Sequence, residues 1–210
     1  MIAPLVLAFP FTGRWMAQNS PANRVPSHGT TLFGTTYAID FVCVDDRGRT
    51  APRSWRSAFG TEAAEIFRGF GADVTAPLAG TIVAVHDGEE DHVSRRSPLA
   101  LAGYALTQGS RVRQGAGAIA GNHVVIAAAP SGPFLLVAHL QRGSVAVRAG
   151  DVVRVGDRLG GCGNSGNSTE PHVHLQAMDA ADAAVARGLP IAFSAPGAPA
   201  LPRNGEPFTV

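Results

Sequence analysis

The stretch Pro171-His172-Val173-His174-Leu175 carries two histidines one residue apart, and it follows a turn-rich run over 160–169. Valine and leucine beside the histidines favour a β-strand. In a strand, residues two apart point to the same face, roughly 6.5–7 Å from each other. Imidazole is the commonest metal ligand and titrates near neutral pH, so the pair can supply one ligand and one second catalytic group. Two surface histidines on an edge strand are the alternative interpretation.

The rest of the chain has the pattern of an all-β protein. Twenty-five glycines and 15 prolines divide it into short apolar runs bounded by turn residues, and no long helical period competes with them. The strands predicted are 6–11, 15–17, 37–44, a strand–turn–strand unit at 72–85, a hairpin of 121–127 with 134–140, and two short strands within 145–160. A short helix or irregular segment is expected at 61–70, and a short alanine-rich helix at 180–188.

An acidic residue stands out on one predicted strand. Over 37–44, Asp40 shares a face with Ala38, Val42 and Val44. A carboxylate on an otherwise apolar face is costly to bury without a partner. We therefore expect Asp40 to meet a cation or a metal ion, with a carboxylate at a solvated strand edge as the alternative.

At 210 residues the chain can build one domain with a sizeable core. We expect a single domain over 1–210, with its core at about 9–193 and an irregular tail at 194–210. The fold expected is a central antiparallel sheet plus a smaller sheet of hairpins, forming a groove over a metal site. Loops over 19–36 and 87–121 would make the walls of this groove.

Composition excludes several classes of function. The 17 basic residues nearly balance the 16 acidic ones, so no global charge indicates nucleic acid or an anionic membrane. All 17 basic residues are arginines, which excludes chemistry that needs a lysine amine. Cys43 and Cys162 are too few for a disulfide framework or a cysteine-rich zinc site, and we interpret both as small buried residues.

Neither a signal peptide nor a membrane span is predicted. The apolar stretch 1–10 lacks a basic n-region and a cleavage site, and is interpreted as a first strand. No run approaches the ~18 apolar residues of a membrane span.

Six segments in one order resemble the lysostaphin and LytM-type zinc endopeptidases, which cleave cross-bridges or stem peptides of peptidoglycan. They are AIDF (38–41), APLAGTIV (76–83), GNHVVI (121–126), AHL (138–140), VVRVGDRLG (152–160) and GNSGNSTEPHVHL (163–175). The resemblance covers most of the chain, from about residue 9 to about residue 193.

The resemblance implies one zinc ion per chain, held by His28, Asp40 and His174, with His139 and His172 as catalytic histidines beside it. Two neutral imidazoles and one carboxylate form a ligand set typical of catalytic zinc, and they leave a position open for water or substrate. The implied reaction is hydrolysis of a peptide bond by zinc-activated water with assistance from the two histidines. Which histidine is the general base stays open.

Two positions depart from the common pattern of this family. Eleven residues separate His28 from Asp40, where the common spacing is His-X-X-X-Asp. Glu170 stands where many relatives carry glycine, and it is expected at the mouth of the site, where it could select substrate charge. Of the remaining histidines, His86 and His92 are interpreted as surface residues and His123 as a packing residue.

Two other classes of function were weighed against an enzyme. The segments 74–83 and 150–157 also resemble half-motifs of biotinyl and lipoyl domains, but a carrier needs an acylated lysine and the chain has none. An inactive LytM-type domain that binds a protein partner or the cell wall is the main alternative. All five expected site positions carry suitable residues, which favours an enzyme.

The bond that is cleaved stays open at this stage. Glycine bridges, D-amino-acid cross-links and ordinary proteins are all candidate substrates for a monomer without a nucleic-acid partner. A wall hydrolase would act outside the cell or in the periplasm and would need an export route; otherwise the protein is expected to be cytoplasmic.

Overall fold

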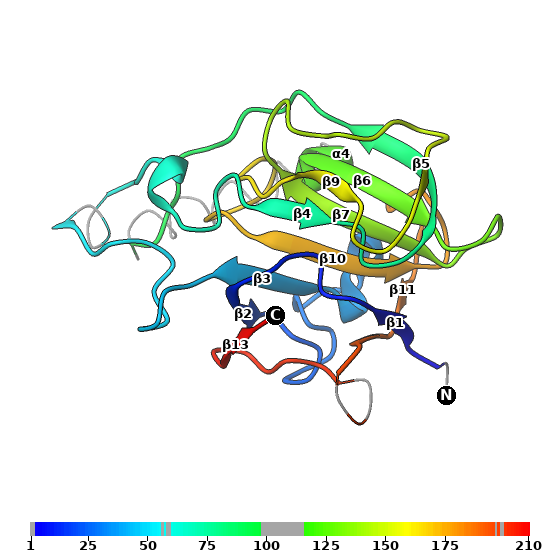
Figure 1. Cartoon of the computed structure of the whole chain (residues 1–210), viewed down its shortest axis with the longest axis horizontal. Helices are drawn as coiled ribbons and strands as arrows, with labels where there is room; N and C mark the ends of the chain where they lie inside the picture. Colours follow the sequence, from blue (N-terminus) through cyan, green and yellow to red (C-terminus); the bar gives the residue numbers. More distant parts are fainter. Residues whose placement is uncertain (1–2, 56, 58–59, 98–115, 196, 198–199) are drawn as a thin grey trace.

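The alternation of short apolar runs and turns produces an all-β chain, as the sequence predicts. The structure is a computed structural model that describes all residues except 1–2, 56, 58–59, 98–115, 196 and 198–199 (Figure 1). Most strands join one antiparallel sheet, in which β10 lies between β3 and β7 (Figure 1). None of the helices in the described part of the chain is long and apolar enough to cross a membrane.

The strands of this sheet follow a spatial order that differs from the chain order. From one edge to the other they are β13 (Pro207–Thr209), β2 (Arg14–Gln18), β3 (Ile39–Cys43), β10 (Val173–Met178), β7 (Phe134–Leu140), β6 (Asn122–Ala127), β5 (Gly80–His86) and β8 (Val152–Val153), with β11 (Gly188–Leu189) paired to β10. The hairpin of β6 and β7 confirms the predicted pairing of 121–127 with 134–140.

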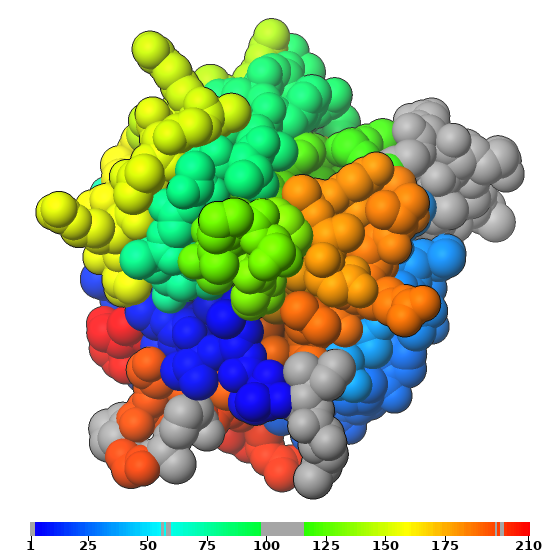
Figure 2. Space-filling view, turned by 90° about the vertical axis from the view of Figure 1, so that its right-hand side faces the viewer, coloured from blue at the N-terminus to red at the C-terminus, as the bar shows by residue number. Residues whose placement is uncertain are grey.

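Two small sheets complete the strand pairing. β4 (Asp73–Thr75) pairs antiparallel with β9 (Arg158–Gly161), and β1 (Leu5–Leu7) pairs parallel with β12 (Ile191–Phe193). Figure 2 shows the dark blue N-terminal residues at the surface, next to the turn between β6 and β7 and to the orange segment. One shallow cavity there is lined by residues 3–5, 131–133 and 189–190. The strand β1 therefore covers this end of the molecule, next to β12.

The large sheet buries different side chains on its two faces. One face carries the main core, which includes Phe41, Val137 and Leu175. A smaller apolar cluster on the other face includes Val125, Leu136 and Ala138. Successive residues of β7 and β10 alternate between these clusters, as strand geometry requires. On this face β10 carries His174 and Gln176, followed by Met178 of the smaller cluster.

Helices are short in the described part of the chain. They include the 3-10 helices η1 (Leu32–Tyr37) and η2 (Ala64–Ile66), and the α-helix α4 (Ala116–Ala120). The segment 61–70, expected as a short helix or irregular, contains η2. Both cysteines are free thiols; Cys162 is buried, as expected, whereas Cys43 is half-buried.

Two sequence-based expectations are wrong. The alanine-rich segment 180–188 forms turns and the start of β11 instead of a helix. The tail, expected to be irregular, ends in β13, which pairs with β2 at the sheet edge. Part of the expected 87–121 loop lies outside the described residues; its described end contains α4.

Candidate active site

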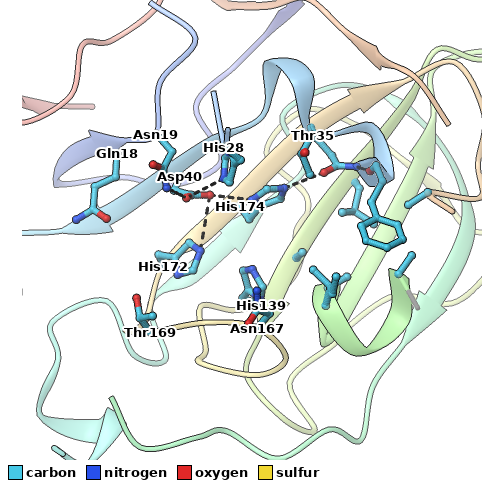
Figure 3. Close-up of a pocket in the computed structure, with 18 of the residues that line it drawn as sticks. Gln18, Asn19, His28, Thr35, Asp40, His139, Asn167, Thr169, His172 and His174 are labelled. Carbon is cyan, nitrogen blue, oxygen red and sulfur yellow. Dashed lines mark hydrogen bonds and ion pairs between the residues drawn. The ribbon is translucent and has the colours of Figure 1, made fainter. Parts of the chain in front are cut away.

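Strand register brings the first two site residues together. His174 in β10 lies directly opposite Asp40 in β3 and Ala138 in β7. Directly opposed residues share one face of a sheet, so the Asp40 carboxylate and the His174 ring meet: His174 Nδ1 lies 2.8 Å from Asp40 Oδ1. His172 enters from the same side, with its Nε2 3.7 Å from the same oxygen (Figure 3). The predicted common face of His172 and His174 is confirmed.

His139 reaches this face through a break in the alternation of β7. Ala138 already points to this face, so a regular strand would turn His139 to the other side. The register between β6 and β7 shifts at this point, and His139 has a φ of 61°. This bulge puts two consecutive side chains on one face. The His139 ring consequently lies 4.6 Å from the His172 ring, measured between centroids.

His28 comes from the loop before η1 and completes the cluster. Its Nε2 lies 3.0 Å from Asp40 Oδ2. The buried Ser27 hydroxyl donates to the Thr35 carbonyl at 3.1 Å and lies 3.0 Å from His28 Nδ1. Because the hydroxyl proton of Ser27 goes to the Thr35 carbonyl, the hydroxyl oxygen accepts a hydrogen bond from His28 Nδ1–H. The lone pair of the His28 ring is then on Nε2. The structure thus brings together His28, Asp40, His139, His172 and His174.

Hydrogen bonds outside the cluster fix the other three rings in the same manner. His139 Nδ1–H donates to the Ser165 carbonyl at 2.8 Å. His172 Nδ1–H donates to the Glu170 carbonyl at 2.8 Å. In both of these rings the nitrogen that faces the cluster, Nε2, is left with the lone pair. Rings held in this way are typical of metal sites, where the second nitrogen orients the ligand.

Gln176 holds the fourth ring, His174, by a hydrogen bond. The orientation of the Gln176 amide is itself fixed by a backbone carbonyl. The Gln176 Nε2 amide donates to the Phe33 carbonyl at 2.7 Å. Its Oε1 therefore faces His174 Nε2, 2.9 Å away, and accepts the Nε2–H. That contact directs Nδ1 of His174 toward Asp40. Asn19, with a φ of 47°, donates from Nδ2 to Asp40 Oδ2 at 2.8 Å and holds the carboxylate from the opposite side.

Charges around the cluster shift its pKa values in opposite directions. Burial raises the pKa of Asp40, but the charges that His28 and His172 carry when protonated, and the hydrogen bonds that protonated His174 and His28 donate, bring it well below its usual value. Burial lowers the pKa of His139 well below its usual value, and the charges of His172 and His174 add to this effect. Burial also lowers the pKa of His174, but the hydrogen bond and charge of Asp40 outweigh it and raise this pKa overall. Asp40 is therefore a buried anion beside a neutral His139.

The donor atoms fit a metal ion. Within the described part of the chain, two overlapping sets have ligand atoms within 4.8 Å of one another: His28, Asp40 and His174, and also His139, His172 and His174. The first set contains two imidazoles and one carboxylate, the chemistry of catalytic zinc sites. It also places the buried carboxylate where a cation would neutralise it.

The cluster opens into a groove of about 430 Å³. Loop residues Asn19 and Thr35, and Ile119 of α4, line it, so the expected walls from 19–36 and 87–121 both contribute. Glu170 lines the groove as well, with Oε2 accepting from Thr50 Oγ1 at 2.8 Å. Glu170 therefore lies at the site, and a role in selecting substrate charge stays a prediction.

The other histidines lie outside this cluster. His86 is exposed and stacks on the half-buried His123, with ring centroids 5.6 Å apart, and His92 is exposed. Sequence reasoning missed Asn19, Ser27 and Gln176. Only Gln176 had a signal, because it lies two residues after His174 in one strand and therefore shares its face.

Comparison with known proteins gives one family model and several solved structures to which the chain is similar. The family model described as peptidase family M23 matches residues 61–187. Among solved structures, the catalytic domain of lysostaphin from Staphylococcus simulans is 18% identical, with 72% of this chain and 74% of that chain covered and a TM-score of 0.41.

Two further structures are similar at the same low level of identity. A mutant catalytic domain of the prophage-encoded M23 protein EnpA from Enterococcus faecalis is 16% identical, with 90% and 91% coverage and a TM-score of 0.42. A zinc-containing peptidase from Vibrio cholerae is 16% identical, with a TM-score of 0.35. The match covers 72% of this chain but only 48% of that protein.

Proposed function

The chain belongs to peptidase family M23, and on that basis we propose that it is a zinc-dependent endopeptidase acting on cross-links or stem peptides of peptidoglycan. The observation that carries the proposal is the set of four histidine rings whose outer nitrogens are tied to hydrogen-bond partners. The inner nitrogens of His28, His172 and His174 lie 2.8–3.7 Å from Asp40, and His139 lies beside His172 and His174. A structural cluster would not need this common orientation.

His28 Nε2, the Asp40 carboxylate and His174 Nδ1 would hold the metal ion, one per chain. Their mutual distances of 3.0 and 2.8 Å already gather the donor atoms around the carboxylate. Zinc held there would supply a Lewis acid for a peptide carbonyl and an acidified water. Asn19 and Gln176 then act as positioning residues, because each hydrogen-bonds a ligand and not the metal.

His139 and His172 are left to move protons. His139 is neutral near pH 7 because burial lowers its pKa, so its Nε2 can accept a proton from an attacking water. His172 presents Nε2 on the same side, with its ring held by the Glu170 carbonyl. Once protonated on Nε2, it can hydrogen-bond the developing oxyanion or give that proton to the departing amine. The two rings share these roles.

The groove favours an extended peptide as substrate. The cluster lies on a sheet face between the 19–36 loop and α4, and the groove extends to both sides of it. A peptide lying along it can place one carbonyl at the cluster and its flanking residues against the walls.

Digestion of purified peptidoglycan tests this function. Sacculi with glycine, alanine and direct cross-links are incubated with the zinc-loaded protein, with and without a chelator, and new amino termini are identified. We expect chelator-sensitive cleavage of at least one type. Failure to cleave any of them, with zinc bound, would favour the alternative of a binding domain.

The division of the histidine pair has its own test. His174→Ala removes a ligand, so we expect stoichiometric zinc to be lost. His172→Ala removes a proton-transfer group, so we expect most zinc to be kept and turnover to fall by roughly 100-fold or more. Zinc per chain is measured by elemental analysis. Zinc loss in His139→Ala and His172→Ala, but not in His28→Ala, would instead assign the metal to the three-histidine set.

A further inference from the structure

The groove changes chemical character from one end to the other. Polar side chains line the end near β2, including Gln18, Asn19, Thr169 and Glu170. The opposite end is apolar, and its main lining residues are Phe33, Ala116, Ile119, Ala120, Leu136 and Ala138. Figure 3 shows Gln18, Asn19 and Thr169 on one side of the cluster, and Thr35 together with unlabelled side chains beside the helix on the other.

The apolar end begins next to the reacting groups. Ala138 lies directly opposite His174, and Leu136 lies directly opposite Gln176, two residues further along both strands. Directly opposed residues have Cβ atoms roughly 5 Å apart, and a step of two residues adds roughly 6.5–7 Å. An extended peptide with its carbonyl at the cluster would therefore place a side chain from one of its next two residues on this surface.

The lining leaves room for such a side chain. Alanines occupy three positions on α4 and β7, and Ala183 lines the groove from the 180–188 segment. A second cavity shares Ala116, Ala120, Leu136 and Ala183 with the groove and continues toward Val125. In the described part of the chain, the side chains lining the apolar end of the groove carry no charge. Gln176, a polar residue opposite Leu136, has its amide bonded to His174 and Phe33.

We propose that this end of the groove is a subsite for an aliphatic side chain of alanine to leucine size, carried by a residue within two positions of the scissile bond. The inference rests on the proposed peptidase function and adds a substrate class to it. Glycine-only bridges leave this surface uncovered, and an acidic side chain would lose its hydration there without gaining a partner. Peptides with an aliphatic residue at that position are therefore the better substrates.

A set of quenched fluorescent peptides tests the preference with the zinc-loaded full chain. The parent is pentaglycine, and single positions are replaced by L-alanine, D-alanine, L-leucine or L-aspartate; the cut bond is located by mass spectrometry. We expect an aliphatic residue on one side of the cut to raise kcat/KM by roughly 10- to 100-fold over glycine, and aspartate there to lower it. The two alanine enantiomers report which backbone configuration the subsite accepts.

A second assay digests two kinds of peptidoglycan in parallel, one with glycine bridges and one with alanine-containing bridges. It tests the subsite even if short peptides are poor substrates. We expect an aliphatic residue within two positions of the new termini. Cleavage only where glycine occupies every one of those positions would overturn the subsite and leave the peptidase function intact. Absence of all cleavage would overturn the peptidase function itself.

Filling the subsite provides the second measurement. Ala183→Leu puts three extra carbons into the apolar end, whereas Ala184→Leu places the same side chain at an exposed neighbour that does not line the groove. We expect Ala183→Leu to lower the ratio of kcat/KM for leucine over glycine peptides at least about fivefold, and Ala184→Leu to leave it unchanged. Zinc content and thermal unfolding confirm that both variants are folded. An unchanged ratio in a folded Ala183→Leu protein would contradict the assignment.

Discussion

At the scale of single residues, the site depends on amides that hydrogen-bond its charged and ring side chains. Gln176 is the clearest case, because its Oε1 accepts from His174 Nε2 and its Nε2 donates to the Phe33 carbonyl. The backbone around that carbonyl is unusual, with positive φ at Phe33 and Gly34. A packed turn thus determines which way the amide points, and the amide determines which nitrogen of His174 faces Asp40.

Gln176→Leu tests this positioning role. Leucine keeps the approximate volume but removes the acceptor for His174 Nε2–H, so we expect zinc affinity to fall by roughly 10- to 100-fold. Gln176→Glu keeps an acceptor and should retain most of the affinity. Competition against a chromophoric chelator measures both. If the leucine variant binds zinc as tightly as the unaltered protein, the hydrogen bond does not position the ligand.

Residue-level prediction from the sequence succeeded where strand alternation alone decides the geometry. His174 lies in β10 and His172 just before it, two residues apart, and Asp40 stands on a strand with apolar neighbours, so their faces could be worked out. The face of His139 could not, since it depends on a bulge set by the pairing of β6 and β7. Asn19 meets Asp40 from a loop with a positive φ, and nothing local in the sequence indicates that contact.

At the scale of elements, one buried ion pair, between Glu62 and Arg96, holds two loop segments together. Glu62 has a side chain that is only 2% exposed and accepts two hydrogen bonds from Arg96, both at 2.8 Å. Backbone hydrogen bonds join Glu62 to Ser94 in both directions. The Arg96 guanidinium also lies 4.9 Å from the Phe67 ring. This group of contacts ties the 50–67 segment to the start of the 87–121 loop.

Glu62→Gln should therefore destabilise the protein in a pH-dependent way. The hydrogen bonds from Arg96 lower the pKa of Glu62 below its usual value of 4.5. A lowered pKa in the folded state means that the carboxylate stabilises the fold above that usual value, and that this contribution is lost as pH falls through the folded-state pKa. We expect a loss of about 1–3 kcal/mol at pH 7, which shrinks in acid.

Urea denaturation of both proteins at pH 7 and at several values below pH 4.5 measures this difference. Glu65→Gln is the matched control, because Glu65 is exposed and its backbone is in η2 of the same segment. A difference between Glu62→Gln and the unaltered protein that stays constant with pH would mean that the charge of Glu62 is not what stabilises the contact.

Elements were predictable where local signals agreed with tertiary pairing. The hairpin of β6 and β7 has two apolar runs joined by a short turn, and it forms as predicted. The 180–188 segment shows the opposite case, since alanines favour a helix. There, Asp182 Oδ1 accepts from Ala184 N, and Asp179 Oδ1 accepts from Arg187 N. Two aspartates offer the backbone alternative partners and hold it in turns, which composition alone did not indicate.

At the scale of the whole molecule, the two ends of the chain close one aromatic core. Phe9 near the N-terminus stacks on Phe193 with centroids 4.6 Å apart, and Phe208 in the last strand lies 4.9 Å from Phe9. Phe41 packs edge-on against all three rings. The neighbour of Phe41 in β3 is Asp40, so the strand that carries the carboxylate is anchored by this cluster on its other face.

The all-β class follows from composition and turn spacing, but the order of strands does not. β3 and β10 are neighbours in the sheet although residues 40 and 174 are far apart in sequence, and such pairings leave no local pattern. β13 is three residues long and begins with Pro207, a residue that an edge strand tolerates at its first position. The tail was predicted to be irregular, and this was wrong because β13 becomes a strand only by pairing with the edge of β2.

Phe208→Ala tests whether this last strand belongs to the cooperative unit that holds the site. Phe208 is half-buried and pairs across β13 and β2 with Trp15, so we expect a loss of about 1–3 kcal/mol, less than for a fully buried phenylalanine. Urea denaturation followed by tryptophan fluorescence measures it, with Val152→Ala as control because Val152 is 79% exposed. The site should still bind zinc below the transition, since its ligands lie on β3, β10 and the 19–36 loop. A midpoint equal to that of the unaltered protein would show that β13 frays independently, and the aromatic cluster would then end at Phe193.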